Sequence, residues 1–91
     1  MSGEQGVASA LRKGKVHCLI IAGDSSDNTR HKFLAMANNS DVPTYIYGEK
    51  NSLGQAVGKP RRAIIAVLDR GFSETIQKTL GENGITAWEK N

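Results

Sequence analysis

Hydrophobic and polar residues fall into blocks along this chain that predict three strands and four helices. Two blocks, at residues 16–22 (VHCLIIA) and 63–68 (AIIAVL), are almost continuously apolar, which is typical of strands buried on both faces. A shorter block, VPTYIYG at 42–48, predicts an edge strand or a strand that begins at Pro43, because proline has no backbone N–H to donate to a ladder.

Apolar residues at helical spacing predict a helix before the first strand and one after each strand. In the first helix these residues are Val7 and Leu11; Ser2 has the spacing of a capping residue, and the helix ends near Gly14. The apolar positions of the other three helices are Phe33, Met36 and Ala37, then Leu53, Ala56 and Val57, then Phe72, Ile76 and Leu80.

Small polar residues and glycines set the expected helix ends. The second helix has four candidate N-caps and runs to about Asn38; the candidates are Asp24, Ser25, Ser26 and Asp27. Ser52 is the expected cap of the third helix, and Gly58 and Gly81 are expected to end the third and fourth.

The order of these elements predicts an α/β protein, a three-layer α/β/α sandwich with a small mixed sheet between helices. Its two buried blocks are expected to be central strands, and the proline-containing block an edge strand. Residues 1–80 form the expected domain. Residues 81–91 form a C-terminal tail, for which a short strand at 85–88 and disorder are both open.

Charge and composition narrow the classes of function. Twelve Lys and Arg residues against nine Asp and Glu give a net charge of +3, and the excess lies in residues 1–70, which permits an anionic partner. The sequence shows no membrane span and no signal peptide, so we expect a cytoplasmic protein. The single cysteine, Cys18, lies in an apolar block and is expected to be a buried thiol.

Residues with catalytic or metal-binding chemistry are few. Asp24 and Asp69 each follow a predicted buried strand, where a pair of carboxylates can hold Mg²⁺, but capping of the next helix is the favoured interpretation. His17 and His31 lie in no motif, and no glycine-rich phosphate loop is present. We therefore expect no enzyme activity, no metal and no cofactor.

Three segments, in the same order, resemble a known family. They are SGEQGVASALRKGKVHCLIIAGDSSDNTRHKF, VPTYIYGEKNSLGQAVGK and RRAIIAVLDRGF. From Ser2 to about Leu80 the chain is similar to the kink-turn RNA-binding family of large-subunit ribosomal proteins, the archaeal L7Ae and eukaryotic L30e group, and within it to the small bacterial YlxQ-like branch.

The resemblance implies the same three-layer fold and the binding of structured, kink-turn-like RNA, ribosomal or regulatory, with the ribosome as a further partner. The residues that it implies for RNA binding lie at the first helix start, after the first strand and before the last strand: Gly3, Glu4, Gln5, Gly23, Asp24, Lys59, Arg61 and Arg62. Basic residues expected to add attraction for RNA are Arg12, Lys13, Arg30 and Lys32.

The chain differs from the family pattern at positions that matter for RNA. Gly6 and Ser9 stand where many members have Glu and Lys, and Gly23 stands where an acidic residue is usual. These differences predict weaker RNA binding. Two alternatives follow, a protein-interaction or ribosome-assembly module and an accessory substrate-binding domain of an RNA methyltransferase.

The family also normally has a further helix and a short strand before the SGE motif, whereas Met1 directly precedes it here. We therefore expect one helical layer and one sheet edge to be less covered than usual. The hypothesis is that the tail around Trp88 closes this gap or that the protein self-associates.

Overall fold

The computed structural model of this chain describes residues 3–82. They form four helices and three strands in the predicted order: α1 (Glu4–Arg12), β1 (Cys18–Ile21), α2 (Asp27–Asn39), β2 (Thr44–Ile46), α3 (Lys50–Ala56), β3 (Ile64–Val67) and α4 (Arg70–Glu82). The expected strand at 85–88 and the capping residue Ser2 lie outside the described residues. None of the described helices is long and apolar enough to cross a membrane.

The three strands form a mixed sheet in the order β2-β1-β3. β1 runs parallel to β2 and antiparallel to β3, so that Leu19 lies opposite Thr44 on one side and Ala66 on the other. β2 is an edge strand, as predicted. The expectation that β3 is a central strand is wrong for the described sheet, in which β3 lies at an edge. A continuous apolar run indicates that helices cover both faces of a strand, but it does not indicate whether another strand pairs with each of its edges.

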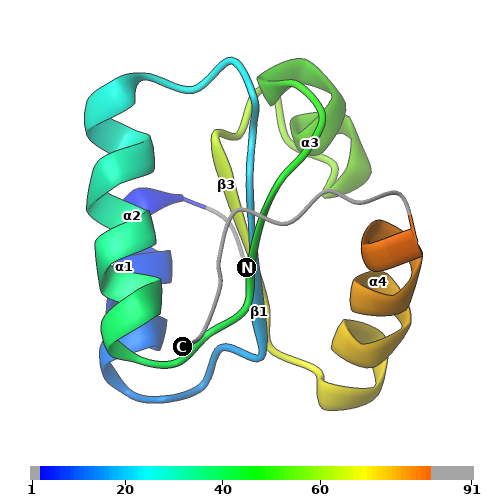
Figure 1. Ribbon diagram of the computed structural model, residues 1–91. Coiled ribbons are helices and arrows are strands. Elements are labelled where there is room, and N and C mark those ends of the chain that lie inside the picture. The colour runs from blue at the N-terminus through cyan, green and yellow to red at the C-terminus, as the bar shows by residue number, and fades with distance from the viewer. Residues whose placement is uncertain (1–2, 83–91) are drawn as a thin grey trace.

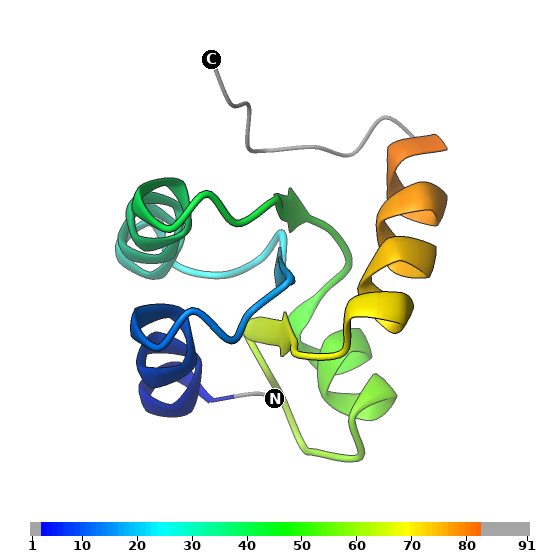
Figure 2. The same cartoon turned by 90° about the horizontal axis from the view of Figure 1, so that it is seen from below.

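Helices cover both faces of the sheet (Figure 1). α1 and α2 lie on one face and α3 and α4 on the other, which is also clear from below in Figure 2. Alternate residues of β1 enter different cores, since side chains of a strand alternate between its faces. Leu19 and Ile21 pack with the α1 and α2 side, whereas Cys18 and Ile20 pack with the α3 and α4 side.

The predicted buried thiol is present at Cys18, which has no exposed surface. Burial raises the pKa of this thiol, against the opposing effect of a hydrogen bond with Ser73. Close by, the Tyr45 hydroxyl donates to Gln77 Oε1 at 3.2 Å and Gln77 Nε2 donates to Ser73 Oγ at 2.9 Å. The first bond joins β2 to α4, and the second, within α4, holds the Gln77 amide in place.

Helix ends follow local chemistry. Of the four candidate caps of α2, Ser26 is the N-cap, and its Oγ accepts the Thr29 N–H at 3.2 Å. α1 and α3 are followed by Gly14 and Gly58 at φ of 69° and 70°, in the left-handed region where a glycine avoids the strain of a side chain. The predicted role of Gly58 is thus confirmed, whereas the prediction that Gly81 ends the fourth helix is wrong, because α4 continues through it to Glu82.

Asp69 is the cap of α4, because its Oδ1 accepts the Phe72 N–H at 2.6 Å. We expect Asp69→Ala to lower the free energy of unfolding by about 1 kcal/mol, since the first turn of α4 loses the side-chain acceptor of one of its N–H groups. Asp69→Asn keeps an acceptor oxygen and should retain most of this stability. Urea denaturation measures both, and equal midpoints for the wild type and Asp69→Ala would contradict the capping role.

Candidate nucleic-acid interface

The loop between β1 and α2, residues 22–26, is held by Arg30. The guanidinium donates to the Ser25 carbonyl at 2.9 Å and to the Gly23 carbonyl at 3.3 Å, and it forms an ion pair with Asp27. Arg30 therefore stabilises the loop, and Asp27 offsets part of its charge. Its contribution to the attraction of an anion is correspondingly smaller than the sequence predicts.

Asp24 connects this loop to the start of α3. Its Oδ1 accepts the Lys50 backbone N–H at 2.8 Å, and beside it the Gly23 N–H donates to the Gly48 carbonyl at 2.8 Å. The expectation that Ser52 caps α3 is wrong, because the helix already begins at Lys50 and its acceptor comes from Asp24 on another part of the chain. Asp24 thus caps a different helix from the one that follows it in sequence.

Residues 59–62, which we call the basic loop, pack against Gly54 of α3. The Lys59 N–H donates to the Gly54 carbonyl at 2.7 Å. A Cβ placed on Gly54 would lie 2.8 Å from the Lys59 carbonyl oxygen and 2.9 Å from the Arg61 backbone nitrogen, so the loop has to move if any other residue stands there. Lys59 and Arg61 are themselves exposed.

Lys50 joins the two loops. Its N–H is bound by Asp24, and its carbonyl accepts the Arg62 N–H at 3.1 Å. The segment 48–50 was not among the residues selected from the sequence. The signal that marks it is Gly48, which follows β2 at a φ of 70° and so turns the chain directly into α3.

The start of α1 supplies exposed groups of a different kind. Gly3 is the N-cap at a φ of 94°, no side chain among residues 3–82 caps the helix, and Glu4 and Gln5 are exposed. A Cβ on Gly3 would meet nothing within 4 Å, so the backbone conformation, and not crowding inside the protein, favours glycine. In Figure 1, α1 begins at its upper end, toward the end of the sheet where β1 stops and β3 starts.

The remaining basic candidates lie elsewhere. Arg12 and Lys13 are at the far end of α1, roughly 13 Å along the axis from its start. Lys32 is exposed on α2, and its Nζ lies 5.4 Å from the centre of the Phe33 ring. The structure therefore brings together the loop after β1, the start of α3 and the basic loop, and it places Arg12 and Lys13 apart from them.

The geometry also decides between the two interpretations of Asp24 and Asp69. Since β1 and β3 are antiparallel, the carboxyl ends of these strands lie at opposite ends of the sheet, so the two carboxylates do not form one metal site. Each instead accepts a backbone N–H at a helix start. Within residues 3–82 no group of three or more His, Cys, Asp and Glu side chains could hold a metal ion.

Comparison with known proteins identifies several relatives. The RNA-binding protein YlxQ of Bacillus subtilis is 30% identical over 76 residues, which cover 84% of this chain and 76% of that protein. The RNA-binding protein YlxQ of Enterococcus faecium is 25% identical over 80 residues, covering 88% of this chain and 77% of its own length.

A solved structure, of a protein with unknown function from Bacillus halodurans C, superimposes with a TM-score of 0.85 at 31% identity; the match covers 89% of this chain and 82% of that one. The model of the Ribosomal protein L7Ae/L30e/S12e/Gadd45 family matches residues 1–77. Because this match spans most of the chain and the four helices and mixed sheet agree with it, the protein belongs to the Ribosomal protein L7Ae/L30e/S12e/Gadd45 family.

Proposed function

We propose that this protein binds structured RNA of the kink-turn type, without catalysing a reaction, and that its RNA is ribosomal or regulatory. The observation that carries the proposal is the junction of the loop after β1 with the basic loop through Lys50. The relatives named as RNA-binding proteins support the same class of partner. Such a role agrees with a cytoplasmic protein that meets the ribosome.

Each part of the surface has a physical role in this proposal. The exposed Lys59 and Arg61 attract phosphates. The start of α1, which no described side chain caps, offers backbone N–H groups beside Gly3, where an RNA strand can approach closely. Gln5 presents an amide that can donate to and accept from the edge of an unpaired base. Kinked RNA displays such splayed bases, whereas a straight duplex does not.

A second candidate, a protein-interaction or ribosome-assembly module, is favoured by Gly6 and Ser9 on α1. Both positions are partly buried and neither carries charge, so α1 provides fewer contacts to RNA than a helix with Glu and Lys there. This candidate predicts stable complexes with protein partners and indifference to RNA.

Titration against a kink-turn RNA and a matched straight duplex, at low and physiological salt, tests the proposal. We expect tighter binding to the kinked RNA and a steep fall of affinity with salt, because bound phosphates release counterions. Gln5→Ala should cost about 1–3 kcal/mol of binding to the kinked RNA, the range for a good base contact.

The matched control is Asn39→Ala, which removes an exposed amide at the last residue of α2, the end of that helix remote from the loop after β1. It should leave both affinities unchanged. Equal, salt-sensitive binding to the two RNAs would show that the surface attracts RNA by its positive charge without recognising the kink. No binding to either RNA would favour the protein-interaction module.

Gly54→Ala tests whether α3 positions the basic loop. The added methyl group collides with the backbone of Lys59 and Arg61, so we expect the protein to lose about 1–3 kcal/mol of stability and to bind RNA several-fold more weakly. Gly71→Ala in α4 is the control, because its Cβ meets only Asp69 Oδ1 at 3.5 Å. Unchanged stability and RNA affinity in Gly54→Ala would show that the loop does not depend on this contact.

Asp24 is expected to act through the cap that it provides, and a pair of variants separates this from a direct contact to RNA. Asp24→Ala removes the acceptor for Lys50 N–H and should lower both the stability, by about 1 kcal/mol, and the RNA affinity. Asp24→Asn keeps the acceptor oxygen and should preserve both. Calorimetry and the same RNA titration measure them, and an Asn variant as impaired as the Ala variant would assign the role to the charge instead.

A further inference from the structure

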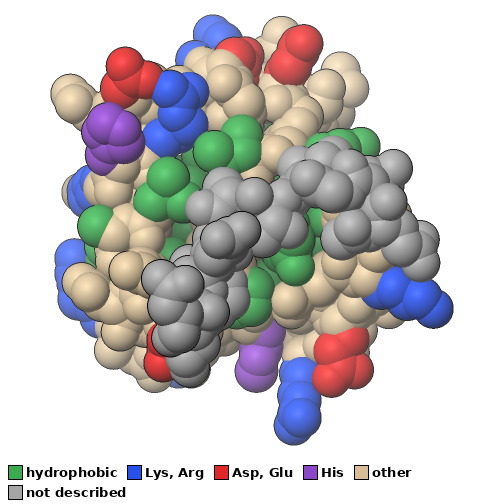
Figure 3. All heavy atoms as spheres, viewed as in Figure 1, with side chains coloured by type: hydrophobic (Ala, Val, Ile, Leu, Met, Phe, Trp, Pro, Cys, Tyr) green, Lys and Arg blue, Asp and Glu red, His purple; other side chains and the backbone are tan. Residues whose placement is uncertain are grey.

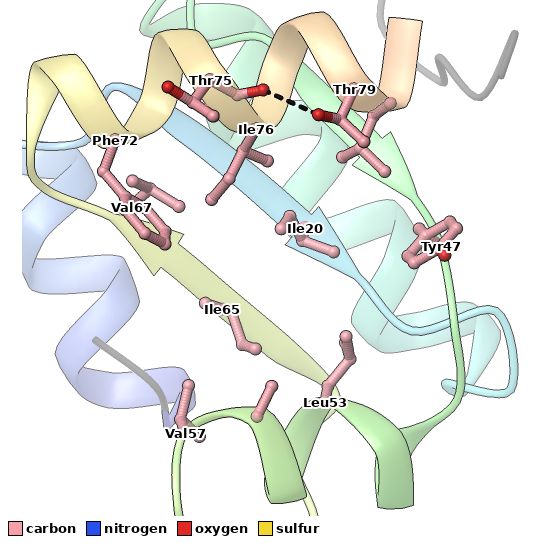
Figure 4. Close-up of a pocket in the computed structure, with 12 residues that line it drawn as sticks. Ile20, Tyr47, Leu53, Val57, Ile65, Val67, Phe72, Thr75, Ile76 and Thr79 are labelled. Atoms are coloured by element: carbon pink, nitrogen blue, oxygen red, sulfur yellow. Dashed lines mark hydrogen bonds between the residues drawn. The ribbon is translucent and has the colours of Figure 1, made fainter. Parts of the chain in front are cut away.

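An apolar groove of about 460 Å³ lies between α3 and α4 on the sheet. Figure 4 shows its walls. Ile20 and Ile65 rise from the sheet, Leu53 comes from α3 and Val57 directly follows this helix, and Phe72 and Ile76 come from α4. Its volume is in the range of sites that enclose a large side chain or a small molecule.

The lining excludes a charged occupant. None of the described residues that line the groove is charged, and the hydroxyls of Thr75 and Thr79 donate to carbonyls of their own helix, those of Gly71 and Thr75. An RNA phosphate placed here would lose its hydration without gaining a partner, which is costly. An apolar side chain would instead remove the groove walls from water.

Large hydrophobic side chains remain exposed beside this groove. Phe72 is 61% exposed and Tyr47 is 46% exposed, and both line it. On the face seen in Figure 3, hydrophobic side chains reach the surface in the middle of the molecule, with charged groups around them. Exposed apolar surface of this kind marks a docking site when a suitable apolar partner is close by.

We propose that the groove is occupied by the C-terminal segment of the same chain, residues 83–91, through the side chain of Trp88. This segment lies outside the described residues, and it carries the apolar Ile85 and Trp88. It follows α4, whose Leu80 lines the groove. The chain therefore leaves α4 at the edge of the site that the segment fills.

Length and tethering favour this occupant over a second copy of the protein. Leu80 itself lines the groove, and from Leu80 to Trp88 the chain can extend about 26–29 Å, so the tether is long enough for Trp88 to turn back toward the groove. A short flexible tether holds its ligand at an effective concentration of roughly millimolar, which a separate molecule has to match.

Tryptophan fluorescence tests the proposal in the full chain, because Trp88 is the only tryptophan. We expect the emission to be blue-shifted from that of the urea-unfolded protein and several-fold less quenched by acrylamide, at every protein concentration. Phe72→Ala should move both readings toward the unfolded values. Leu68→Ala, which truncates another exposed hydrophobic residue outside the groove lining, should change neither.

A double-mutant cycle provides a second, independent measurement. Trp88→Ala should lower the urea midpoint of the wild type but have little effect in the Phe72→Ala background, since residues in contact do not act additively. Emission equal to that of the unfolded chain, or additive effects in the cycle, would overturn the proposal. A blue shift and a protection from acrylamide that increase with protein concentration would also overturn the proposal and would assign the groove to a second copy of the protein.

Discussion

The hydrogen bond from the Lys50 backbone N–H to the Asp24 carboxylate is the contact on which the candidate interface depends. It joins the end of the central strand β1 to the start of α3, and the neighbouring Gly23 to Gly48 bond reinforces it. Once α3 is fixed there, the Lys50 carbonyl and the surface of Gly54 hold the basic loop. Positive side chains on a short loop are thereby presented from a rigid base, which lowers the conformational entropy that binding has to offset.

The mixed direction of the sheet explains why these loops meet. β1 and β2 are parallel, so the loops that follow them emerge at the same end, and β3 is antiparallel, so the loop that precedes it also lies there. Three connections from distant parts of the sequence are brought to one end by this topology alone. The same topology sends Asp69, which follows β3, to the opposite end, where it serves only α4.

Local patterns predict the elements of this fold well because each pattern has a local cause. Ser26 caps the helix that begins beside it, and Gly58 adopts a backbone angle that a side chain would strain. The contacts that shape the interface are different in kind. Asp24 caps α3, a helix that is distant from it in the sequence. Gly54 leaves room for the backbone of Lys59 and Arg61, which comes close to it only in the folded chain. A residue that can cap a helix is recognisable in the sequence, but the helix that it caps in the fold is not. For this reason the sequence indicated the neighbouring Ser52 as the cap of α3, and not the distant Asp24.

α3 links the interface to the apolar groove. It has only seven residues, too few to be stable by itself, so its position comes from its contacts. Leu53 packs into the groove side of the sheet, and the next residue, Gly54, supports the basic loop. The same turn of α3 therefore buries Leu53 against the sheet and supports the basic loop. Whatever fills the groove removes more of this turn from water, and it thereby stabilises the platform from which Lys59 and Arg61 reach their partner.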